Sequence, residues 1–174
     1  AVGRLGIEKN FTELVGIWAM IAKDYPDWKL RIVGDGYVDV RILQRVKEHG
    51  LEAQFELCPS TPHIQKHYLS ASIFALSSVF EGLPLVTIEA ESMGLPLVSY
   101  ACPCGPRDVI RDGQDGFLVE PGDKETFAAR LRQLIEDEEL RRRMGQAAKI
   151  NSQRFSLENV MKQWVDLFAE LTAE

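Results

Sequence analysis

Residues 73–94 read IFALSSVFEGLPLVTIEAESMG and predict a strand, a turn and a helix in succession. The apolar run from Ile73 to Leu76 ends at two serines, and a Gly-Leu-Pro turn follows. We place Pro84 as the first helical residue, because its fixed φ angle suits a helix and its missing N–H would have no partner there. The first turn of a helix leaves free N–H groups that favour an anion, so we expect function at this junction.

Two carboxylates, Glu81 and Glu89, flank this junction in a Glu-x7-Glu spacing. Glu89 falls in the second turn of the expected helix, from which it can reach the edge of a ligand held over the helix start. Glu81 lies beside the same ligand on the loop. Ionised carboxylates accept hydrogen bonds from hydroxyl groups. The pair therefore suits a phosphorylated polyol.

Apolar runs alternate with helical patterns along most of the chain. The expected strands cover residues 30–33, 54–57, 73–76, 97–100 and 117–119. The expected helices cover residues 11–22, 38–49, 63–70 and 106–111, with one more that starts at Pro84. Asn10 and Glu13 have the spacing of a capping box, and Gly50 is placed to end the second helix. Strands separated by helices imply βαβ units, so we predict an α/β fold with a doubly wound, Rossmann-like parallel sheet.

The end of the chain has a helical pattern throughout. We expect helices over residues 124–135, 140–152 and 157–171, the last starting after Ser156. The last helix carries an apolar stripe that consists of Val160, Trp164, Leu167, Phe168 and Leu171. We expect this stripe to pack in the core, with cover by a further domain as the alternative.

Composition limits the classes of function. With 174 residues, 45% hydrophobic and 26% charged, residues 1–174 can form one domain with its own core. A net charge of −6 disfavours nucleic acid and anionic lipid as partners. The three cysteines are too few for a disulfide framework, and no apolar run approaches the ~20 residues of a membrane span. We therefore predict a cytoplasmic protein, and the start at Ala1 without Met or a signal pattern predicts a fragment.

Several sequence motifs follow one another along the chain. They are Gly3-Arg4-Leu5 with Glu8-Lys9-Asn10, Val33-Gly34-Asp35-Gly36, the pair Glu81 and Glu89, and Gly116-Phe117-Leu118-Val119. The chain resembles the donor-binding half of the retaining glycosyltransferases of family 4, group 1, which have the two-domain GT-B fold. The resemblance implies that an acceptor-binding domain precedes this chain, that the active cleft lies between the two, and that this part alone is inactive.

The resemblance also implies roles for individual residues. Arg4 and Lys9 would bind the diphosphate, whose charge grows as it leaves. Glu89 would accept hydrogen bonds from ribose hydroxyls, and Glu81 would be the catalytic carboxylate at the donor sugar or reacting centre. The remaining donor-binding residues are expected to be Gly34, Gly36, Gly82, Leu83, Pro84 and Leu85. The alternatives to these ligand roles are a solvated surface pair for Arg4 and Lys9 and an exposed glutamate on a helix for Glu89.

Other ligand classes fit the sequence less well. The stretch from Gly34 to Asp39 lacks the third glycine of a dinucleotide fingerprint, so no nicotinamide cofactor is expected. Cys102 and Cys104 have poor zinc spacing, and the chain has no Asp-x-Asp pair, so no metal is predicted. Cys58 stands where the family usually has a small residue beside the nucleobase, which leaves UDP- and GDP-linked donors as alternatives.

The function expected from the resemblance is transfer of a hexosyl group, with retention, from a nucleotide diphosphate sugar to a glycan or lipid-linked acceptor. The stretch from Cys102 to Asp108 is similar to bacterial members that build surface polysaccharides. Any membrane contact would come through the missing acceptor domain. Two alternatives are a GT-B-type nucleotide-sugar epimerase and a non-enzymatic regulatory domain such as a phospho-receiver. The latter would need an acidic pocket with a phosphorylatable aspartate.

Overall fold

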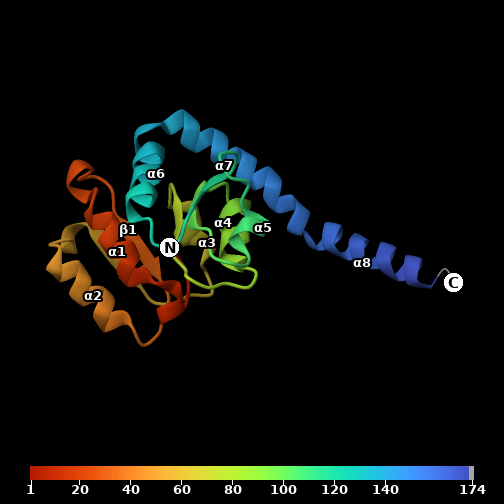
Figure 1. Cartoon of the computed structure of the whole chain (residues 1–174), viewed down its shortest axis with the longest axis horizontal. Helices are drawn as coiled ribbons and strands as arrows, with labels where there is room; N and C mark the ends of the chain where they lie inside the picture. The colour runs from red at the N-terminus through yellow and green to blue at the C-terminus, as the bar shows by residue number, and fades with distance from the viewer. Residues whose placement is uncertain (173–174) are drawn as a thin grey trace.

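The strands and helices of the computed structural model alternate as the sequence predicts, and the structure describes residues 1–172. The strands are β1 (Leu30–Val33), β2 (Phe55–Cys58), β3 (Phe74–Leu76), β4 (Leu97–Tyr100) and β5 (Gly116–Val119). The helices are α1 (Phe11–Ala19), α2 (Asp39–Glu48), α3 (Gln65–Leu69), α4 (Leu85–Ser92), α5 (Pro106–Val109), α6 (Lys124–Glu136), α7 (Glu138–Ser152) and α8 (Leu157–Leu171). Figure 1 shows their arrangement, and the α/β class is confirmed.

The strands are parallel but form two sheets rather than the single sheet that we expected. One sheet has the order β1-β2 and the other the order β3-β4-β5. Val2 extends the first sheet through a parallel bridge to Val33 on β1. A cavity of about 370 Å³ is lined by residues of both sheets, including Arg31 from β1 and Phe74 from β3. Ala1 and Val2 line the same cavity, and β1 and β3 share no ladder in the part of the chain that the structure describes.

Two apolar clusters stabilise these sheets. The larger packs α1, α2 and α6 against β1, β4 and β5, and its fully buried aromatic pair Tyr100 and Phe127 meets edge to face at 5.0 Å. The smaller packs α4 against β3 through side chains such as Ala90, Phe74 and Leu76. Parallel strands are buried on both faces, and every residue of β3 and β4 is buried, including the polar Ser99.

Two helix starts differ from the sequence predictions. Asn10 precedes α1 in a left-handed conformation with φ 51°, and its side chain makes no capping bond, so the capping box is wrong. The Glu13 carboxylate instead accepts a hydrogen bond from the Tyr100 hydroxyl at 2.7 Å. Pro84 is the N-cap of α4 with ψ 88°, and the helix begins one residue later at Leu85. Glu89 remains in the second turn.

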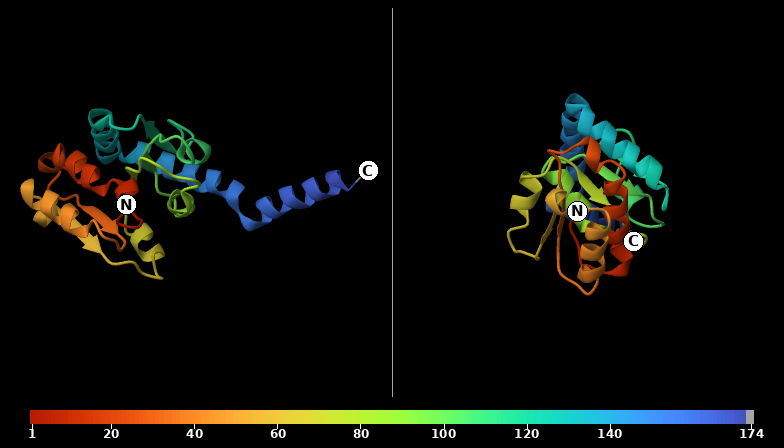
Figure 2. Two further views of the ribbon diagram at one scale, coloured as in Figure 1. Left: turned by 60° about the horizontal axis from the view of Figure 1, so that its bottom comes forward. Right: turned by 90° about the vertical axis from the view of Figure 1, so that its left-hand side faces the viewer.

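Helix α8 overturns the expected core packing of the last helix. None of its residues is buried, and Trp164 and Phe168 are 50% and 57% exposed. Figure 2 shows α8 extending away from the rest of the domain beyond α7. An apolar stripe at helical spacing indicates a face that can be covered, but α8 follows the 3-10 helix Gln153–Phe155 and buries none of its residues.

Candidate functional site

Three loops meet at the carboxyl ends of the strands. They are the segment after Val2, the loop after β1 and the loop after β3. The first two join through the Leu5 N–H, which donates to the Asp35 carbonyl at 2.8 Å. The first and third join through the Val79 N–H, which donates to the Glu8 carbonyl at 3.0 Å. Ligands of open α/β sheets bind at this edge, so the loops form the candidate site.

Gly34 and Gly36 let the first two loops approach closely. A Cβ on Gly34 would lie 1.9 Å from the Gly3 carbonyl oxygen, and one on Gly36 would lie 2.5 Å from the Leu5 carbonyl oxygen. Larger residues at these positions would therefore push the loops apart. The glycines shape the site through backbone packing, and this reason is independent of any ligand.

Glu89 and Arg4 line one cavity with Gly34. This cavity has a volume of about 390 Å³, and its complete lining is Val2, Gly3, Arg4, Val33, Gly34, Asp35, Ser60, Thr61, Ile64 and Glu89. The Asp35 carboxylate accepts hydrogen bonds from the backbone and hydroxyl of Ser60, which fixes one rim. The structure thus brings three of the expected donor-binding residues together at one concave surface.

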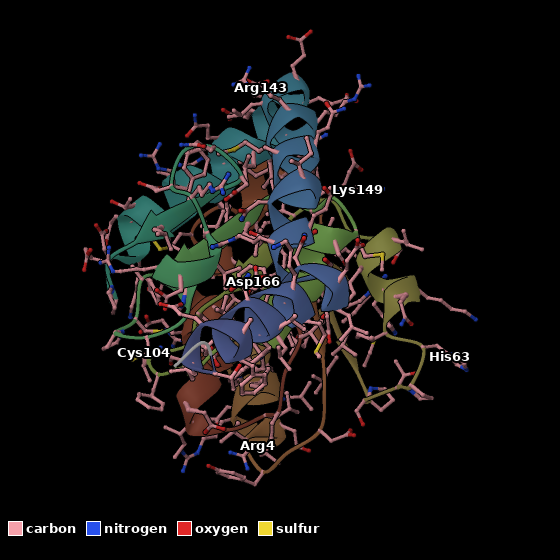
Figure 3. The ribbon with its side chains drawn as sticks, turned by 90° about the vertical axis from the view of Figure 1, so that its right-hand side faces the viewer. Arg4, His63, Cys104, Arg143, Lys149 and Asp166 are labelled. Atoms are coloured by element: carbon pink, nitrogen blue, oxygen red, sulfur yellow. The ribbon has the colours of Figure 1, made fainter. Side chains whose placement is uncertain are left out.

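Arg4 is the most open of these residues. Its side chain is 71% exposed, and its guanidinium contacts Glu8 at 2.6 Å. Figure 3 shows the Arg4 side chain at the outer surface of the molecule. An exposed pair of this kind costs little to rearrange, so Arg4 is free to bind an incoming anion.

Lys9 and Glu81 form a much more enclosed ion pair. The Lys9 ammonium donates to the Glu81 carboxylate at 2.6 Å, and the two side chains are only 15% and 9% exposed. The pair connects the first loop to the third across 72 residues of sequence. Two residues that the resemblance assigns to different parts of a ligand are therefore bonded to each other.

The turn from Gly82 to Leu85 leads into α4 without a side-chain cap at the helix start. Leu83 and Leu85 are 51% and 62% exposed, and among residues 1–172 nothing beyond the chain neighbours lies within 4 Å of the place where a Gly82 Cβ would stand. The side chains of Leu83 and Leu85 therefore face open space, whereas Pro84 is buried. Gly36, Lys9, Glu81 and this turn do not line the 390 Å³ cavity itself.

Tyr68 and Gly105 contact residues of the candidate site from other segments of the chain. Tyr68 on α3 donates its hydroxyl to Glu89 at 2.7 Å, and burial together with the Glu89 carboxylate raises the pKa of Tyr68. Gly105 packs so tightly that a Cβ would lie 2.0 Å from the Gly82 carbonyl oxygen. Both contacts join segments far apart in sequence, and no local pattern marks them.

A buried polar cluster lies behind α4. The fully buried Glu91 carboxylate faces the Asn151 amide at 3.4 Å on α7. Burial, with Asp115 nearby, raises the pKa of Glu91 to about 8. Burial also raises the pKa of Asp115, whose carboxylate accepts a hydrogen bond from the Arg111 N–H at 2.8 Å.

Residues 1–172 carry neither a metal-binding cluster nor a membrane-spanning helix. Among them, no group of three or more His, Cys, Asp or Glu side chains could hold a metal ion. His63 and Cys104 lie on opposite sides of the molecule in Figure 3. No helix within this range has the length and apolar character to cross a membrane.

The fold and the loops at its strand ends define the class of protein. The structure superposes on crystal structures of the S. aureus glycosyltransferase TarM, one of them a complex with UDP, with a TM-score of 0.90, 27% identity and coverage of 96% of this chain and 34% of that one. This is the architecture of the C-terminal domain of GT-B glycosyltransferases. The chain belongs to the glycosyl transferases group 1 family, whose model matches residues 1–151.

Curated relatives agree with this membership. The amylovoran biosynthesis glycosyltransferase AmsD of Erwinia amylovora is 40% identical over 167 residues, which cover 96% of this chain and 46% of that protein. An uncharacterized glycosyltransferase of Haemophilus influenzae is 35% identical over 164 residues, with coverage of 94% and 46%. The chain thus spans about half the length of these relatives.

Proposed function

We propose that this chain is the nucleotide-sugar-binding domain of a retaining glycosyltransferase that makes bacterial polysaccharide. The cavity lined by Arg4, Gly34 and Glu89 is the observation that carries the proposal, and Glu89 lies on α4, whose start has no side-chain cap. It combines a cationic side chain, close backbone and a carboxylate acceptor on one concave surface. The structural neighbour TarM was solved with UDP, which supports a nucleotide-linked donor.

The charged groups divide the donor between them. Arg4 and Lys9 bind the diphosphate, and Glu89 accepts hydrogen bonds from the ribose. A lysine ammonium has three donors, so Lys9 can keep its contact with Glu81 at 2.6 Å and still donate to phosphate oxygens. Glu81 is thereby held at the end of the diphosphate where the sugar begins. The backbone from Gly82 to Leu85 completes the pocket around the phosphate and sugar.

Transfer follows from this arrangement. As the glycosidic bond breaks, negative charge grows on the leaving diphosphate, and the Lys9 and Arg4 cations stabilise it. The Glu81 carboxylate stabilises positive charge that develops on the sugar ring. The leaving diphosphate accepts the acceptor's proton on the same face, which retains the anomeric configuration. The acceptor is held by a second domain in the longer protein.

Thermal unfolding with UDP, GDP and ADP, each at millimolar concentration, tests the proposal. A ligand at ~100 times its dissociation constant adds about 2.7 kcal/mol of stability. We expect the midpoint to rise by roughly 5–10 °C with one base series. No shift with any of these diphosphates would contradict the proposal.

Variants then separate the roles of the residues. Arg4→Ala should weaken diphosphates much more than nucleosides, whereas Glu89→Ala should weaken both. Arg45→Ala is the matched control, because Arg45 is paired to Glu48 at 3.2 Å on the surface of α2. Product analysis on the longer protein distinguishes transfer to an acceptor from isomerisation of the free sugar nucleotide.

A further inference from the structure

Tyr68 and Glu89 form a contact between a buried and an exposed side chain. Tyr68 is only 2% exposed and packs beside Phe74, with ring centroids 6.0 Å apart. Its hydroxyl donates to Oε2 of Glu89 at 2.7 Å. Glu89 lies on the exposed surface of α4 and lines the 390 Å³ cavity. The Tyr68 hydroxyl therefore connects the packed interior to a residue that lines the candidate site.

The contact restricts the carboxylate. A glutamate on a helix surface ordinarily samples several rotamers and loses that freedom when it binds a ligand. Within residues 1–172 the Glu89 carboxylate accepts this one protein hydrogen bond, and it does so through one oxygen. The second oxygen, Oε1, stays available to a molecule in the cavity. A fixed donor on one oxygen thus presents the other in a defined position.

We propose that Tyr68 is a positioning residue that orients Glu89 toward the ribose and so makes the site prefer ribonucleotides over deoxyribonucleotides. The inference rests on the proposed function, because it assumes that Glu89 binds the ribose. A carboxylate held in place in advance forms its hydrogen bonds to ribose hydroxyls at a lower entropic cost. A nucleotide without the 2′-hydroxyl makes fewer of these hydrogen bonds, so it gains less affinity from the oriented carboxylate.

The hydroxyl stays a donor throughout the physiological range. Burial is the larger cause of the raised pKa of Tyr68, and the adjacent Glu89 carboxylate adds to it. Tyr68 therefore does not ionise beside Glu89 and does not repel it. The geometry also keeps the aromatic ring away from the ligand, because Tyr68 is absent from the lining of the 390 Å³ cavity.

The test is the preference for the 2′-hydroxyl, measured by isothermal titration calorimetry. UDP and GDP are each compared with their 2′-deoxy forms in the parent chain and in Tyr68→Phe, which keeps the ring and removes the hydroxyl. We expect Tyr68→Phe to lower the parent's preference by about tenfold, equal to about 1.4 kcal/mol. Affinity for the deoxy form should fall less than affinity for the ribonucleotide, since the deoxy form lacks the 2′-hydroxyl.

Tyr100→Phe is the matched control. Tyr100 is also buried and also donates to a glutamate, Glu13, at 2.7 Å, but neither residue lines the cavity. A merely structural loss of a buried hydroxyl should therefore lower stability in both variants and lower the preference in neither. In a Glu89→Gln background, Tyr68→Phe should no longer change the preference, because the two residues act as a pair.

The outcomes separate the two proposals. If the parent chain prefers the ribonucleotide and Tyr68→Phe keeps the whole preference, the inference about Tyr68 is wrong and the proposed function stands. If the parent binds UDP or GDP without any preference, Glu89 does not read the ribose and the inference is also wrong. If the parent binds neither diphosphate, the proposed function falls and takes the inference with it.

Discussion

Lys9 and Glu81 should stabilise each other, because both are mostly withdrawn from water. Lys9→Met would leave the Glu81 carboxylate, 9% exposed, without its cation. We expect a loss of about 2–3 kcal/mol in the free energy of unfolding, measured by urea denaturation. The double variant Lys9→Met, Glu81→Gln should recover most of that loss, since the carboxylate charge is then gone.

Lys162→Met is the control for this pair. Lys162 contacts Asp166 at the same 2.6 Å, but the side chains are 70% and 61% exposed. Its loss should cost less than about 1 kcal/mol. Equal losses for Lys9→Met and Lys162→Met would show that burial does not strengthen the Lys9 pair.

Glu91 should make stability depend on pH. Its pKa is raised from 4.5 to about 8 by burial and Asp115, so the folded chain holds a proton that the unfolded chain releases. The stabilisation is complete below pH ~4.5 and is lost as pH rises through the folded value, at up to about 1.4 kcal/mol per pH unit. Relative to Glu91→Gln, the parent should therefore lose stability between pH 5.5 and 7.5 in urea denaturation. Parallel pH profiles would contradict this.

The quantity to measure is the difference in the free energy of unfolding between the parent and Glu91→Gln at each pH. Other titrating groups contribute equally in parent and variant, so their contributions cancel in this difference. Asp115, Arg111 and Arg154 also influence the pKa of Glu91, and these residues are present in both the parent and the variant.

At the level of residues, the sequence shows those relations that lie within one local motif. The spacing of Glu81 and Glu89 is visible in one stretch, and Arg4, Gly34 and Glu89 do line one cavity. Tyr68 and the bond between Lys9 and Glu81 were not visible. Each depends on the distance between side chains on different elements, which the sequence does not contain. The assigned roles of these residues remain predictions.

Between elements, the loop from Ala101 to Gly105 supports the turn that leads into α4. Gly105 has φ 86°, and a Cβ there would meet the Gly82 carbonyl oxygen at 2.0 Å and Pro84 Cδ at 2.5 Å. Gly105→Ala should therefore cost about 3 kcal/mol in urea denaturation, from backbone strain plus the clash. It should also weaken nucleotide binding, because the turn at Gly82 must shift.

Gly113→Ala isolates the backbone part of this cost. Gly113 has φ 75°, and within the described residues nothing except its chain neighbours lies within 4 Å of the place where its Cβ would stand. We expect about 1 kcal/mol from the left-handed conformation alone and no effect on binding. Similar losses in both variants would mean that the turn at Gly82 yields without cost.

Helix α8 should add little to the stability of the domain. None of its residues is buried, so a chain that ends at Ser156 loses no core packing. Thermal unfolding followed by circular dichroism should show a midpoint within about 2 °C of the parent, which is below about 1 kcal/mol for a chain of this size. A fall of more than about 5 °C would mean that α8 packs on the domain in solution.

At this scale the sequence predicted most elements, because buried parallel strands and amphipathic helices have distinct periods. Prediction from sequence failed where the structure of a segment depends on which other part of the molecule it contacts. The stripe on α8 has the same 3.6-residue period as a core helix. Asn10 and Glu13 have capping-box spacing, but Asn10 takes a left-handed turn and Glu13 bonds Tyr100 instead.

The whole chain should bind its donor without transferring the sugar. It spans about half the length of relatives such as AmsD, at 46%, and the site lies at one open edge of the sheets. In a radiolabelled UDP-sugar assay we expect saturable binding but no product above the protein-free rate. Transfer to a simple acceptor by residues 1–174 alone would contradict the need for a second domain.

Because α8 projects from the domain, the fluorescence of its tryptophan can report what binds to this helix. Of the three tryptophans, Trp18 is 5% exposed and Trp28 is half-buried, whereas Trp164 is 50% exposed on α8. Acrylamide should quench the emission of Trp164 first, leaving a bluer spectrum from the other two. Any molecule that covers α8 should shield Trp164, so a change in quenching would report docking on this helix without an added label.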